Sequence, residues 1–473
     1  MSKTITMKFG GTSVGSVEAI RNVVTIIKRE IEARNRVAIV ISAMSKVTDS
    51  LIESVRVAAD GDKWGYTSLS RDLRDRHEDT INQLMAACVE RDKVLLTINK
   101  LLDNHLELCN AINILGEATP RIIDAVVSHG ERLSVQLLAA VLQHHGVNAR
   151  PVDAGQIIRT DDNHQNAQPY WDETEANITH RVLPLLDEGI VPVITGFIGT
   201  APDGNYTTLG RGGSDYSAAI FAAFLESDEF VIWTDVDGVM TTDPRVDSRA
   251  RVLPYVSYQE VGELAFYGAK VLHPKTVQPI INRGIPMWVR NTFNPDYPGT
   301  KIGHEAWESH TVIKAVTSIR NVSMLTVSGK GMLGVPGIAG RTFLSASQAQ
   351  ANILMISQSS SEQSFCFTVM DSVAQSVKVA VEHELRQEIL RQNVDGIEVQ
   401  EDIVIITVVG AGMRGIPGVA GRIFTTMGDD RINVLAIAQG SSECSISFVV
   451  AEEDAERAVR TLHNLALEPA PVE

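Results

Sequence analysis

The chain has 473 residues, of which 44% are hydrophobic and 21% charged, so its composition suits an ordinary globular protein with large cores. Its length suggests about three domains. The formal net charge of −16 disfavours nucleic acid or an anionic membrane as a general partner, and a phosphate site in such a chain must gather cations locally or use a metal.

The four cysteines are scattered and form no C-x-x-C pair or cluster with histidine, so we expect reduced thiols and no zinc site. No apolar run reaches the length of a membrane span. The first predicted strand begins within a few residues of Met1, which leaves no room for a signal peptide. We therefore expect a cytoplasmic protein.

The first glycine-rich turn, residues 8–15, reads KFGGTSVG and lies between two regular elements. Residues 4–7 alternate as a strand does, and apolar residues recur at helical spacing over 17–27. A strand that runs through glycines into a helix directs backbone N–H groups at an anion, and Lys8 adds a charge. The turn is neither a P-loop, whose lysine follows the glycines, nor a dinucleotide fingerprint, so an ordinary strand–turn–helix is the plain alternative.

A second strand is predicted at 37–41, where the apolar run VAIVI is typical of a parallel sheet covered on both faces. A loop of small residues follows at 42–49, and we expect it beside the first turn because ligands bind at the carboxyl ends of parallel strands. The stretch from 60 to 130 is predicted to be mostly helical and to serve as scaffold or subunit contact. Residues 128–134 are predicted to form a turn that opens another helix.

A second glycine-rich turn at 207–217 reads TTLGRGGSDYS and follows a strand predicted at 190–195. Arg211 supplies a bidentate fork for a carboxylate or a phosphate. Asp215 could orient a catalytic lysine, bind magnesium or cap the helix. Two such anion sites in one domain arise by chance far less often than one, so the pair indicates a site that handles phosphate.

A third polar loop follows the strand predicted at 230–233 and reads TDVDGVMTTDPR. It lacks the bidentate glutamate and the flanking helices of a calcium loop, and it suits a nucleotide better. Residues 268–274, GAKVLHP, add a second lysine. The stretch 291–300 contains prolines and a glycine, and it is predicted to be a linker that closes the domain.

The last third of the chain is a duplication. The turn at 329–341 returns at 410–422 with an offset of 410 − 329 = 81 and no gap. Each copy reads as a strand, a glycine–proline turn that opens a helix, two strands and an amphipathic helix, which predicts a duplicated α+β module. Whether the strands near 314–319 and 397–401 exchange between the copies stays open at this point.

The two anion-binding turns, two lysines, an arginine and an aspartate-bearing loop indicate phosphoryl transfer, which needs positioning and charge neutralisation more than covalent chemistry by the protein. With these motifs in this order, the chain resembles the aspartate kinases over essentially its whole length. The resemblance rests on KFGGTS at 8–13, GER at 130–132, GRGGSD at 210–215, WTD at 233–235, GAKVLHP at 268–274 and two tandem ACT-type modules.

The resemblance implies an α/β fold, with an amino acid kinase-type domain over 1–300 whose mainly parallel sheet is flanked by helices. Two α+β, ferredoxin-like ACT modules follow over 313–395 and 396–470. It also implies that ATP with Mg²⁺ phosphorylates the β-carboxylate of L-aspartate to 4-phospho-L-aspartate, the first step towards lysine, threonine and methionine. The acceptor is already a carboxylate, so no general base is required. No protein-held metal site is expected.

The resemblance assigns roles to individual residues. The catalytic set is Lys8, Arg211 and Asp215, in which Asp215 supports Lys8 or the phosphate loop. The substrate-binding set is Thr48, Glu131, Phe197, Arg211 and Ser214, with Arg211 on a carboxylate of aspartate and Glu131 on its ammonium. The ATP-binding set is Lys8, Gly10, Gly11, Ser13, Thr234, Asp235, Arg245 and Lys270, with Lys8 and the amides of the two glycines on the transferring phosphoryl group.

The ACT pair resembles the regulatory region of bifunctional aspartate kinase–homoserine dehydrogenases, in which Ile-x-Gln at the end of a strand contacts threonine. The predicted effector set is Asn352, Ile356, Gln358, Asn433, Ile437 and Gln439, although the two glutamines could instead hold neighbouring loops. The resemblance implies feedback inhibition, by threonine rather than lysine, and a homodimer or larger assembly. Because the chain ends at Glu473 without a dehydrogenase domain, we expect a monofunctional kinase.

Two other functions stay open. Another member of the amino acid kinase fold would act on glutamate, acetylglutamate or a nucleoside monophosphate, but such relatives do not ordinarily combine the GER motif with tandem ACT modules. The alternative outside enzymes is an amino acid sensor whose kinase domain no longer turns over. The retained Lys8, Glu131, Arg211 and Asp215 argue against a sensor, and aspartate-dependent turnover of ATP would eliminate it.

Overall fold

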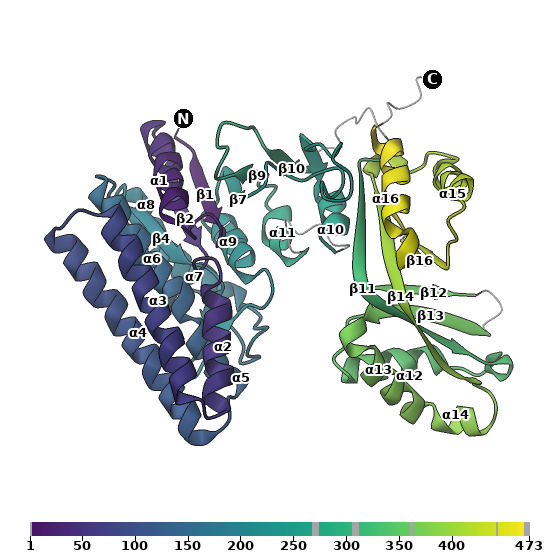
Figure 1. Cartoon of the computed structure of the whole chain (residues 1–473). Coiled ribbons are helices and arrows are strands. Elements are labelled where there is room, and N and C mark those ends of the chain that lie inside the picture. The colour runs from purple at the N-terminus through teal and green to yellow at the C-terminus, as the bar shows by residue number, and fades with distance from the viewer. Residues whose placement is uncertain (1, 267–273, 305–311, 360–362, 441–442, 468–473) are drawn as a thin grey trace. The chain divides into compact units, whose positions relative to one another are not determined.

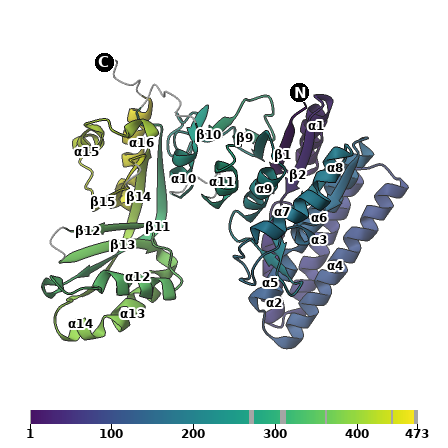
Figure 2. The same ribbon diagram turned by 180° about the vertical axis from the view of Figure 1, so that it is seen from behind.

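The computed structural model describes residues 2–266, 274–304, 312–359, 363–440 and 443–467. Their contacts divide the chain into two compact units, whose elements are labelled in Figures 1 and 2. Unit 1 comprises Met1–Val239, Val252–Tyr258 and Val271–Glu305, and unit 2 comprises Met240–Arg251, Gln259–Lys270 and Ala306–Glu473. Within the described ranges, no helix has the length and apolar character that crossing a membrane requires.

Unit 1 is built on an eight-stranded sheet in the order β3-β4-β2-β1-β7-β9-β10-β8. Neighbouring strands from β3 to β9 run parallel, and β10 runs antiparallel to β9. The strands are β1 (Thr4–Phe9), β2 (Arg36–Ile41), β3 (Ala149–Val152), β4 (Val191–Thr195), β7 (Glu229–Thr234), β8 (Tyr255–Ser257), β9 (Met287–Asn291) and β10 (Thr300–Gly303). Every residue of β1 is buried, as expected for a parallel sheet covered on both faces.

Helices and a small hairpin complete unit 1 (Figure 1). The helices are α1 (Val17–Glu32), α2 (Val47–Ala59), α3 (Lys63–Leu84), α4 (Val89–Leu115), α5 (Pro120–Val127), α6 (His129–His144), α7 (Trp171–Arg181), α8 (Leu183–Asp187), α9 (Gly213–Phe224) and α11 (Pro274–Ile281). The hairpin pairs β5 (Ile198–Thr200) with β6 (Tyr206–Thr208). One core cluster joins helices α1 to α6 to the sheet, and alternate residues of β1 (Ile5, Met7 and Phe9) belong to it.

The helical stretch predicted from 60 to 130 is confirmed as α3 to α5, but two other predictions about connecting segments are wrong. Residues 128–134 do not form a turn, because Ser128 alone separates α5 from α6 and its backbone is itself helical. Residues 291–300 are not a linker, because they connect β9 to β10, which pair in one sheet. Proline and glycine mark a tight connection between strands as readily as a boundary between domains.

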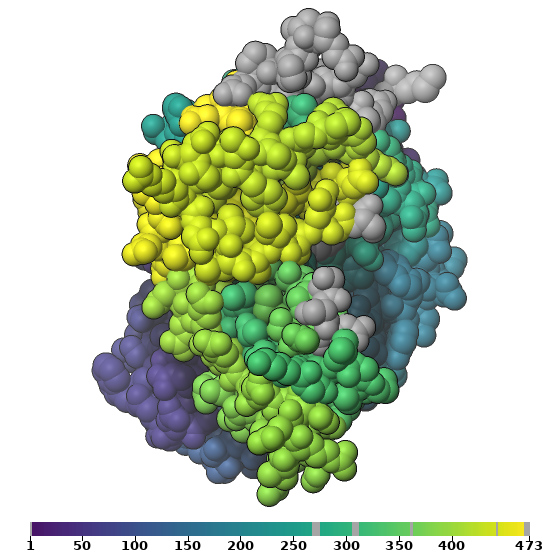
Figure 3. All heavy atoms as spheres, turned by 90° about the vertical axis from the view of Figure 1, so that its right-hand side faces the viewer, coloured from purple at the N-terminus to yellow at the C-terminus, as the bar shows by residue number. Residues whose placement is uncertain are grey.

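Unit 2 carries an antiparallel six-stranded sheet in the order β12-β13-β11-β14-β16-β15, and Figure 3 shows one face of this unit. Its strands are β11 (Ala315–Ser328), β12 (Met355–Gln358), β13 (Ser364–Met370), β14 (Gly396–Val409), β15 (Ala436–Gln439) and β16 (Ser445–Ala451), and its helices are α12 (Ile338–Gln348), α13 (Asp371–Glu384), α14 (Arg386–Leu390), α15 (Val419–Asp429) and α16 (Glu452–Leu467). Both copies of the repeat contain strand, helix, two strands and helix in that order. The predicted duplicated α+β module is therefore confirmed.

The two modules share their first strands. Residues 315–319 of β11 pair with 405–409 of β14, and 324–328 pair with 396–400, with a register shift between the two stretches. Val316 of β11 therefore belongs to the core of the second module, and Ile397 of β14 belongs to the core of the first. The question that the sequence left open is answered, because each long strand completes the sheet of both modules.

Two segments that precede the repeats in the sequence belong to unit 2. In the first, Met240–Arg251, the hydroxyl of Thr241 and the carboxylate of Asp247 bond to the two ring nitrogens of the buried His463, each at 2.8 Å. His463 lies on α16, the last helix of the second module. A piece of chain that leaves β7 of unit 1 is thus held by the C-terminal helix of unit 2.

The second segment is α10 (Tyr258–Phe266), whose residues from Gln259 onward belong to unit 2. The carboxylate of Glu260 forms a buried ion pair with Lys314 at 2.9 Å. It also accepts a hydrogen bond of 2.6 Å from the backbone N–H of Ala411, at the start of the second glycine–proline turn. This helix therefore contacts the repeat at the turn that opens α15.

Candidate active site

Four loops meet where the parallel strands β1, β2, β4 and β7 end. Backbone hydrogen bonds connect each strand end to a neighbouring loop. The N–H of Ser42 donates to the carbonyl of Phe9 at 3.1 Å, and the N–H of Gly196 donates to the carbonyl of Ile41 at 2.8 Å. The N–H of Gly10 donates to the carbonyl of Trp233 at 3.1 Å. The first glycine-rich turn, the loops after β2 and β4 and the third polar loop consequently begin along one edge of the sheet, where ligands bind in open α/β folds.

Lys8 and Asp215 form an ion pair at this edge. The Nζ of Lys8, on β1, lies 2.6 Å from Oδ1 of Asp215 in the first turn of α9, and the side chains are 10% and 17% exposed. A side chain at Gly10 would place its Cβ 3.5 Å from the same Nζ, so the glycine leaves space beside the ammonium. The pair holds a nearly desolvated cation in one position, with room next to it for an anion.

Glu131 is the buried carboxylate of the site. Its Oε1 accepts a hydrogen bond of 3.1 Å from the N–H of Ala43, whereas its buried Oε2 has no hydrogen-bond partner among the described residues. Burial raises its pKa to about 7, against the opposing effects of the backbone N–H groups of Ala43 and Glu131 and of the charge on Lys8. A buried oxygen without a partner is costly, and a bound cation would satisfy it.

Glycines allow the elements around these side chains to approach closely. A Cβ at Gly130 would lie 2.8 Å from that of Ala43, and a Cβ at Gly196 would lie 2.8 Å from that of Ser214. A Cβ at Gly11 would lie 3.0 Å from the carbonyl oxygen of Ala43. The first turn, the loop after β2, and helices α6 and α9 can therefore surround one site only with glycine at these positions.

Phe197, between β4 and β5, has a left-handed backbone conformation with φ of 69°. This conformation is rare for a bulky side chain and costs about 1–3 kcal/mol. The backbone is held by a hydrogen bond of 3.1 Å from Phe197 N–H to Ser217 Oγ and one of 2.9 Å from Leu209 N–H to the Phe197 carbonyl. Its ring lies against Gly213, the first residue of α9. Such strain is concentrated at functional sites.

Arg76 on α3 contacts two of the loops, and no sequence motif distinguishes it. Its guanidinium donates to the carbonyl oxygens of Ser45 at 2.7 Å and Gly15 at 3.1 Å. Burial lowers its pKa. A lone arginine within a predicted helix carries no local signal of such a role, because both partners are distant in sequence.

The remaining residues predicted to bind the substrate lie on the same loops and helices. Arg211 is exposed between Gly210 and Gly212, both of which have positive φ, and Ser214 is half-buried in the first turn of α9. Thr48 is half-buried in the first turn of α2. All three belong to unit 1, together with Lys8, Glu131, Phe197 and Asp215.

The residues predicted to bind ATP differ in their surroundings, because some of them are already hydrogen-bonded within the protein. The N–H of Gly10 is bonded to the Trp233 carbonyl, whereas none of the described residues accepts a hydrogen bond from Gly11. The buried hydroxyl of Ser13 bonds to the Trp233 carbonyl at 3.2 Å and to the hydroxyl of Thr292 at 2.7 Å, so it holds loops together. Of the two glycine amides predicted to contact the phosphoryl group, that of Gly10 is thus already bonded within the protein.

Thr234 is the last residue of β7 and Asp235 follows it, and the threonine hydroxyl donates to the exposed aspartate at 3.2 Å. Arg245 belongs to unit 2, where it is exposed and paired with Asp243 at 2.5 Å. Lys270 lies outside the described residues. In the part of the chain that the structure describes, no group of three or more His, Cys, Asp or Glu side chains could hold a metal ion.

The predicted effector residues occupy equivalent positions in the two modules of unit 2. Ile356 and Gln358 lie on β12, and Ile437 and Gln439 lie on β15, with the isoleucines 46% and 45% exposed. Asn352 and Asn433 are exposed in the loops that precede these strands. The second module has a pocket of about 300 Å³ between its glycine–proline turn (413 and 415–420), Gln439, Glu443 and Ile446. The carboxylate of Glu443 accepts from Gly415 N–H there at 3.0 Å.

Comparison with known proteins agrees with this geometry. The model of the amino acid kinase family matches residues 3–291, and that of the ACT domain matches 325–385 and 406–465. The chain is 37% identical over 463 residues to the chloroplastic bifunctional aspartokinase/homoserine dehydrogenase 1 of Arabidopsis thaliana, across 97% of this chain and 50% of that protein. It is 31% identical over 471 residues to the lysine-sensitive aspartokinase 3 of Escherichia coli, across 98% of this chain and 99% of that protein.

Among solved structures, that of E. coli aspartokinase III in complex with aspartate and ADP (R-state) superposes with a TM-score of 0.83 at 30% identity. The superposition covers 98% of this chain and 100% of the other. The chain therefore belongs to the amino acid kinase family and, within it, to the aspartokinases. It spans about half the length of the first curated relatives that it matches, which are bifunctional.

Proposed function

We propose that the chain catalyses phosphorylation of the side-chain carboxylate of L-aspartate by ATP with Mg²⁺, the first step towards lysine, threonine and methionine. The observation that carries this proposal is the buried Glu131, whose unpartnered oxygen suits an amino acid's ammonium and whose pKa is affected by Lys8. The solved relative from E. coli, which holds aspartate and ADP, supports the same pairing of ligands.

Lys8 and the amide of Gly11 would neutralise the transferring phosphoryl group. A carboxylate oxygen of aspartate attacks the γ-phosphorus, the bond to the β–γ bridging oxygen breaks, and ADP leaves with that electron pair. The acceptor carries no proton to remove, so the main barrier to overcome is repulsion between two anions. The position of Lys8, fixed by Asp215 at 2.6 Å, provides charge where that repulsion arises. Mg²⁺ on the ATP phosphates would neutralise part of their charge.

The substrate would be oriented by its two ends. Glu131 binds the ammonium through its free oxygen, and Arg211 binds a carboxylate through its guanidinium fork. Thr48, Phe197 and Ser214 line the same set of loops. The distance between Glu131 and Arg211 must then match the distance between the ammonium and the carboxylate that Arg211 binds.

We further propose that an amino acid effector inhibits the kinase at the ACT modules and that threonine is preferred over lysine. Both modules present an exposed Ile-x-Gln at a strand end, and the chain is more similar to the bifunctional plant relative than to the lysine-sensitive one from E. coli. The strands that carry these residues, β12 and β15, are the two edges of the six-stranded sheet. A strand at the end of a sheet carries backbone groups that could pair with a second copy, which supports a homodimer.

We infer that Glu260 couples the effector modules to the kinase. Its carboxylate bonds to Ala411 N–H and pairs with Lys314, while its helix belongs to the stretch that the amino acid kinase model matches. An effector that binds one arrangement of the turn after Ala411 better than another would shift the position of α10. That shift reaches unit 1 through the chain itself, because α10 begins at Tyr258.

The proposed function is tested by coupled ADP release with ATP, Mg²⁺ and L-aspartate, with threonine, lysine or both added. We expect aspartate-dependent release that Lys8→Ala abolishes and threonine suppresses. ADP release that threonine does not change but lysine suppresses would contradict the choice of effector and leave the kinase activity supported. No aspartate-dependent release by the wild-type chain would favour the amino acid sensor over the kinase.

A further inference from the structure

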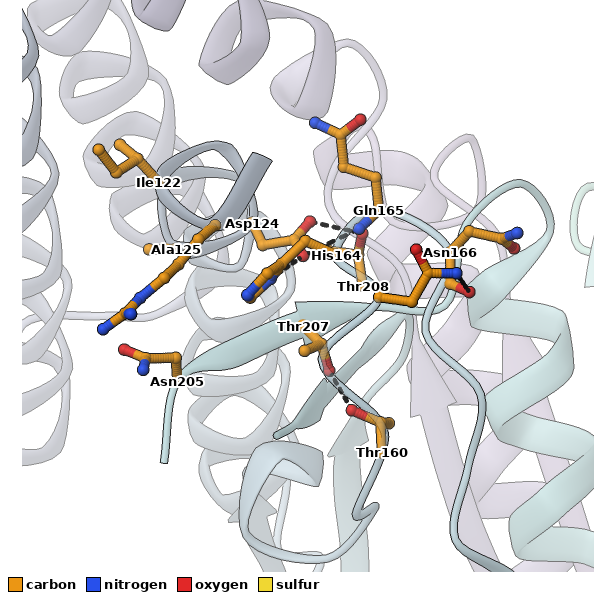
Figure 4. A network of polar contacts seen from close by, with 12 residues as sticks. Ile122, Asp124, Ala125, Thr160, His164, Gln165, Asn166, Asn205, Thr207 and Thr208 are labelled. Carbon is orange, nitrogen blue, oxygen red and sulfur yellow. Dashed lines mark hydrogen bonds and ion pairs between the residues drawn. The ribbon is translucent and has the colours of Figure 1, made fainter. Parts of the chain in front are cut away.

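Asp124 is a fully buried carboxylate outside the set of residues discussed so far. It lies on α5, within the otherwise apolar run IIDAVV, and its side chain has no exposed surface. Oδ1 accepts from the hydroxyl of Thr208 at 2.7 Å. Oδ2 accepts from His164 Nδ1 at 2.8 Å and from the N–H of Gln165 at 3.0 Å. Figure 4 shows these three donors directed at the one carboxylate.

The donors belong to the structure that supports the second glycine-rich turn. Thr208 ends β6, two residues before Gly210, and its carbonyl accepts from the N–H of Ala167 at 3.0 Å. A Cβ at Gly210 would lie 3.0 Å from Asn166 Oδ1 and 3.1 Å from the carbonyl oxygen of Gln165. The loop that Asp124 holds therefore lies directly against the turn that presents Arg211.

The other end of the same helix leads to Glu131. α5 ends at Val127, and Ser128 N–H donates to the backbone carbonyl of Asp124 at 3.0 Å. α6 then begins at His129, so Glu131 is in its first turn. One buried carboxylate is consequently bonded to the hairpin that leads to Arg211 and lies on the helix that leads directly to Glu131.

We propose that Asp124 is a positioning residue that sets the spacing between Glu131 and Arg211 and so determines the affinity for the amino acid substrate. The inference rests on the proposed function, because it takes these two residues as the ligands of the ammonium and a carboxylate. Loss of one donor to Asp124 would free the Gly210 turn that presents Arg211. A disturbance that also reached Asp215, in the first turn of α9, would act on kcat through Lys8, whereas Gly11 lies in the turn after β1. The expected effect is thus on aspartate and not on ATP.

A purely structural role would lower the melting temperature without changing the affinity for aspartate in the protein that remains folded. The chain offers a matched control for this distinction. Thr207 is adjacent to Thr208 in β6 and is equally buried, but its hydroxyl bonds to Thr160 at 2.7 Å (Figure 4). Thr207→Val removes a buried hydroxyl from the same hairpin without removing a bond to Asp124.

The experiment compares Thr208→Val, Thr207→Val, Thr208→Ser and Asp124→Asn by melting temperature and by the KM values for aspartate and ATP. We expect Thr208→Val and Asp124→Asn to raise the KM for aspartate at least tenfold with the KM for ATP within twofold. Thr208→Ser, which keeps the hydroxyl, and Thr207→Val should keep the aspartate KM within twofold of wild type. If Asp124→Asn does not fold, Thr208→Val alone decides.

The inference is overturned if Thr208→Val lowers only the melting temperature, or if Thr207→Val raises the aspartate KM as much as Thr208→Val does. Its failure can be told from failure of the proposed function, because the latter appears in the wild-type chain. A wild type that shows aspartate-dependent ADP release, with variants of unchanged aspartate KM, refutes the role of Asp124 and leaves the kinase assignment intact.

Discussion

The ammonium of Lys8 lies 2.6 Å from the carboxylate of Asp215, so the first strand of the chain and the helix that follows the second glycine-rich turn meet at one ion pair. Each partner lies beside a glycine-rich turn that sequence patterns pick out separately. Their contact joins the two turns into one site, and it gives Lys8 a fixed position instead of the freedom of a surface lysine.

Replacement of Asp215 by asparagine is expected to lower kcat about 100-fold with a smaller change in the KM for ATP, because the ammonium loses its fixed position beside the reacting phosphoryl group. Steady-state kinetics of ADP release measure both constants. Glu229→Gln is the control, since it removes an ion pair of similar length from Lys3, at the other end of β1. A kcat for Asp215→Asn equal to that of the control would contradict the role of the pair.

The pKa of Glu131 predicts how stability depends on pH. Burial raises this pKa to about 7 from an ordinary 4.5, so the folded chain binds more protons than the unfolded chain between these values. Stability without ligand should therefore fall as the pH rises from about 4.5 to 7 and then level off, by about 3 kcal/mol in total from this group. Glu131→Gln should remove that fall, and urea unfolding at a series of pH values measures it. If the free energy of unfolding depends on pH in the same way for the variant and the wild type, the raised pKa of Glu131 is contradicted.

The raised pKa of Glu131 also predicts that the binding of substrate releases a proton. An ammonium needs the charged form of Glu131, so below about pH 7 the binding of aspartate must displace a proton, and the affinity must weaken as the pH falls. Calorimetric titration at pH 6 in buffers of different ionisation enthalpy counts that proton. Binding that releases no proton at this pH would show that Glu131 is already charged or does not contact the ammonium.

The double variant Glu260→Gln with Lys314→Met is expected to retain basal turnover and to lose most of its inhibition by the effector, because the link from Ala411 to α10 is weakened. Both partners of the buried pair are replaced, since removing one would leave an uncompensated buried charge that costs about 3–5 kcal/mol. Dose–response curves for threonine and lysine provide the measurement. Arg320→Gln, which breaks exposed pairs with Glu452 and Glu456 in the same unit, should respond like wild type.

Glu443→Ala is expected to lower the concentration of effector needed for half-inhibition by about threefold, the size of an exposed charged contact. The reason is that the Glu443 carboxylate accepts the hydrogen bond of Gly415 N–H. The carboxylate of an effector would otherwise accept from the same donor, so the two compete. Glu443→Gln keeps an acceptor and should show a smaller change. An unchanged or weaker response of the alanine variant would indicate that the effector does not bind at this turn.

Elements with a local sequence signal could be predicted from the sequence. The apolar runs at 37–41 and 230–233 predict buried strands that the structure contains as β2 and β7, because continuous burial in a parallel sheet requires such runs. The repeat predicts the two modules for a similar reason, since each copy must build the same core. The repeat alone does not show whether β11 and β14 are shared between the two modules, because pairing within a copy and pairing between copies fit the same sequence pattern.

The parts of the site that sequence reasoning missed depend on contacts between distant residues. Arg76 and Asp124 lie in helices that read as scaffold, and their hydrogen bonds to distant loops are evident only in the structure. The acidic residue within the apolar run of α5 was a signal, but a buried carboxylate has many ordinary explanations. For Ser13 the local pattern points to a ligand, because a hydroxyl in a glycine-rich turn can bind a phosphate. In the structure its hydroxyl is bonded to that of Thr292.

The central claim is that a phosphoryl group is transferred to a carboxylate, and trapping the product tests it most directly. The chain is incubated with ATP, Mg²⁺, L-aspartate and hydroxylamine, which converts an acyl phosphate into a stable hydroxamate. We predict aspartate β-hydroxamate in a one-to-one ratio with ADP, and neither product from Lys8→Ala. ADP without hydroxamate, or no ADP at all from the wild-type chain, would contradict the account.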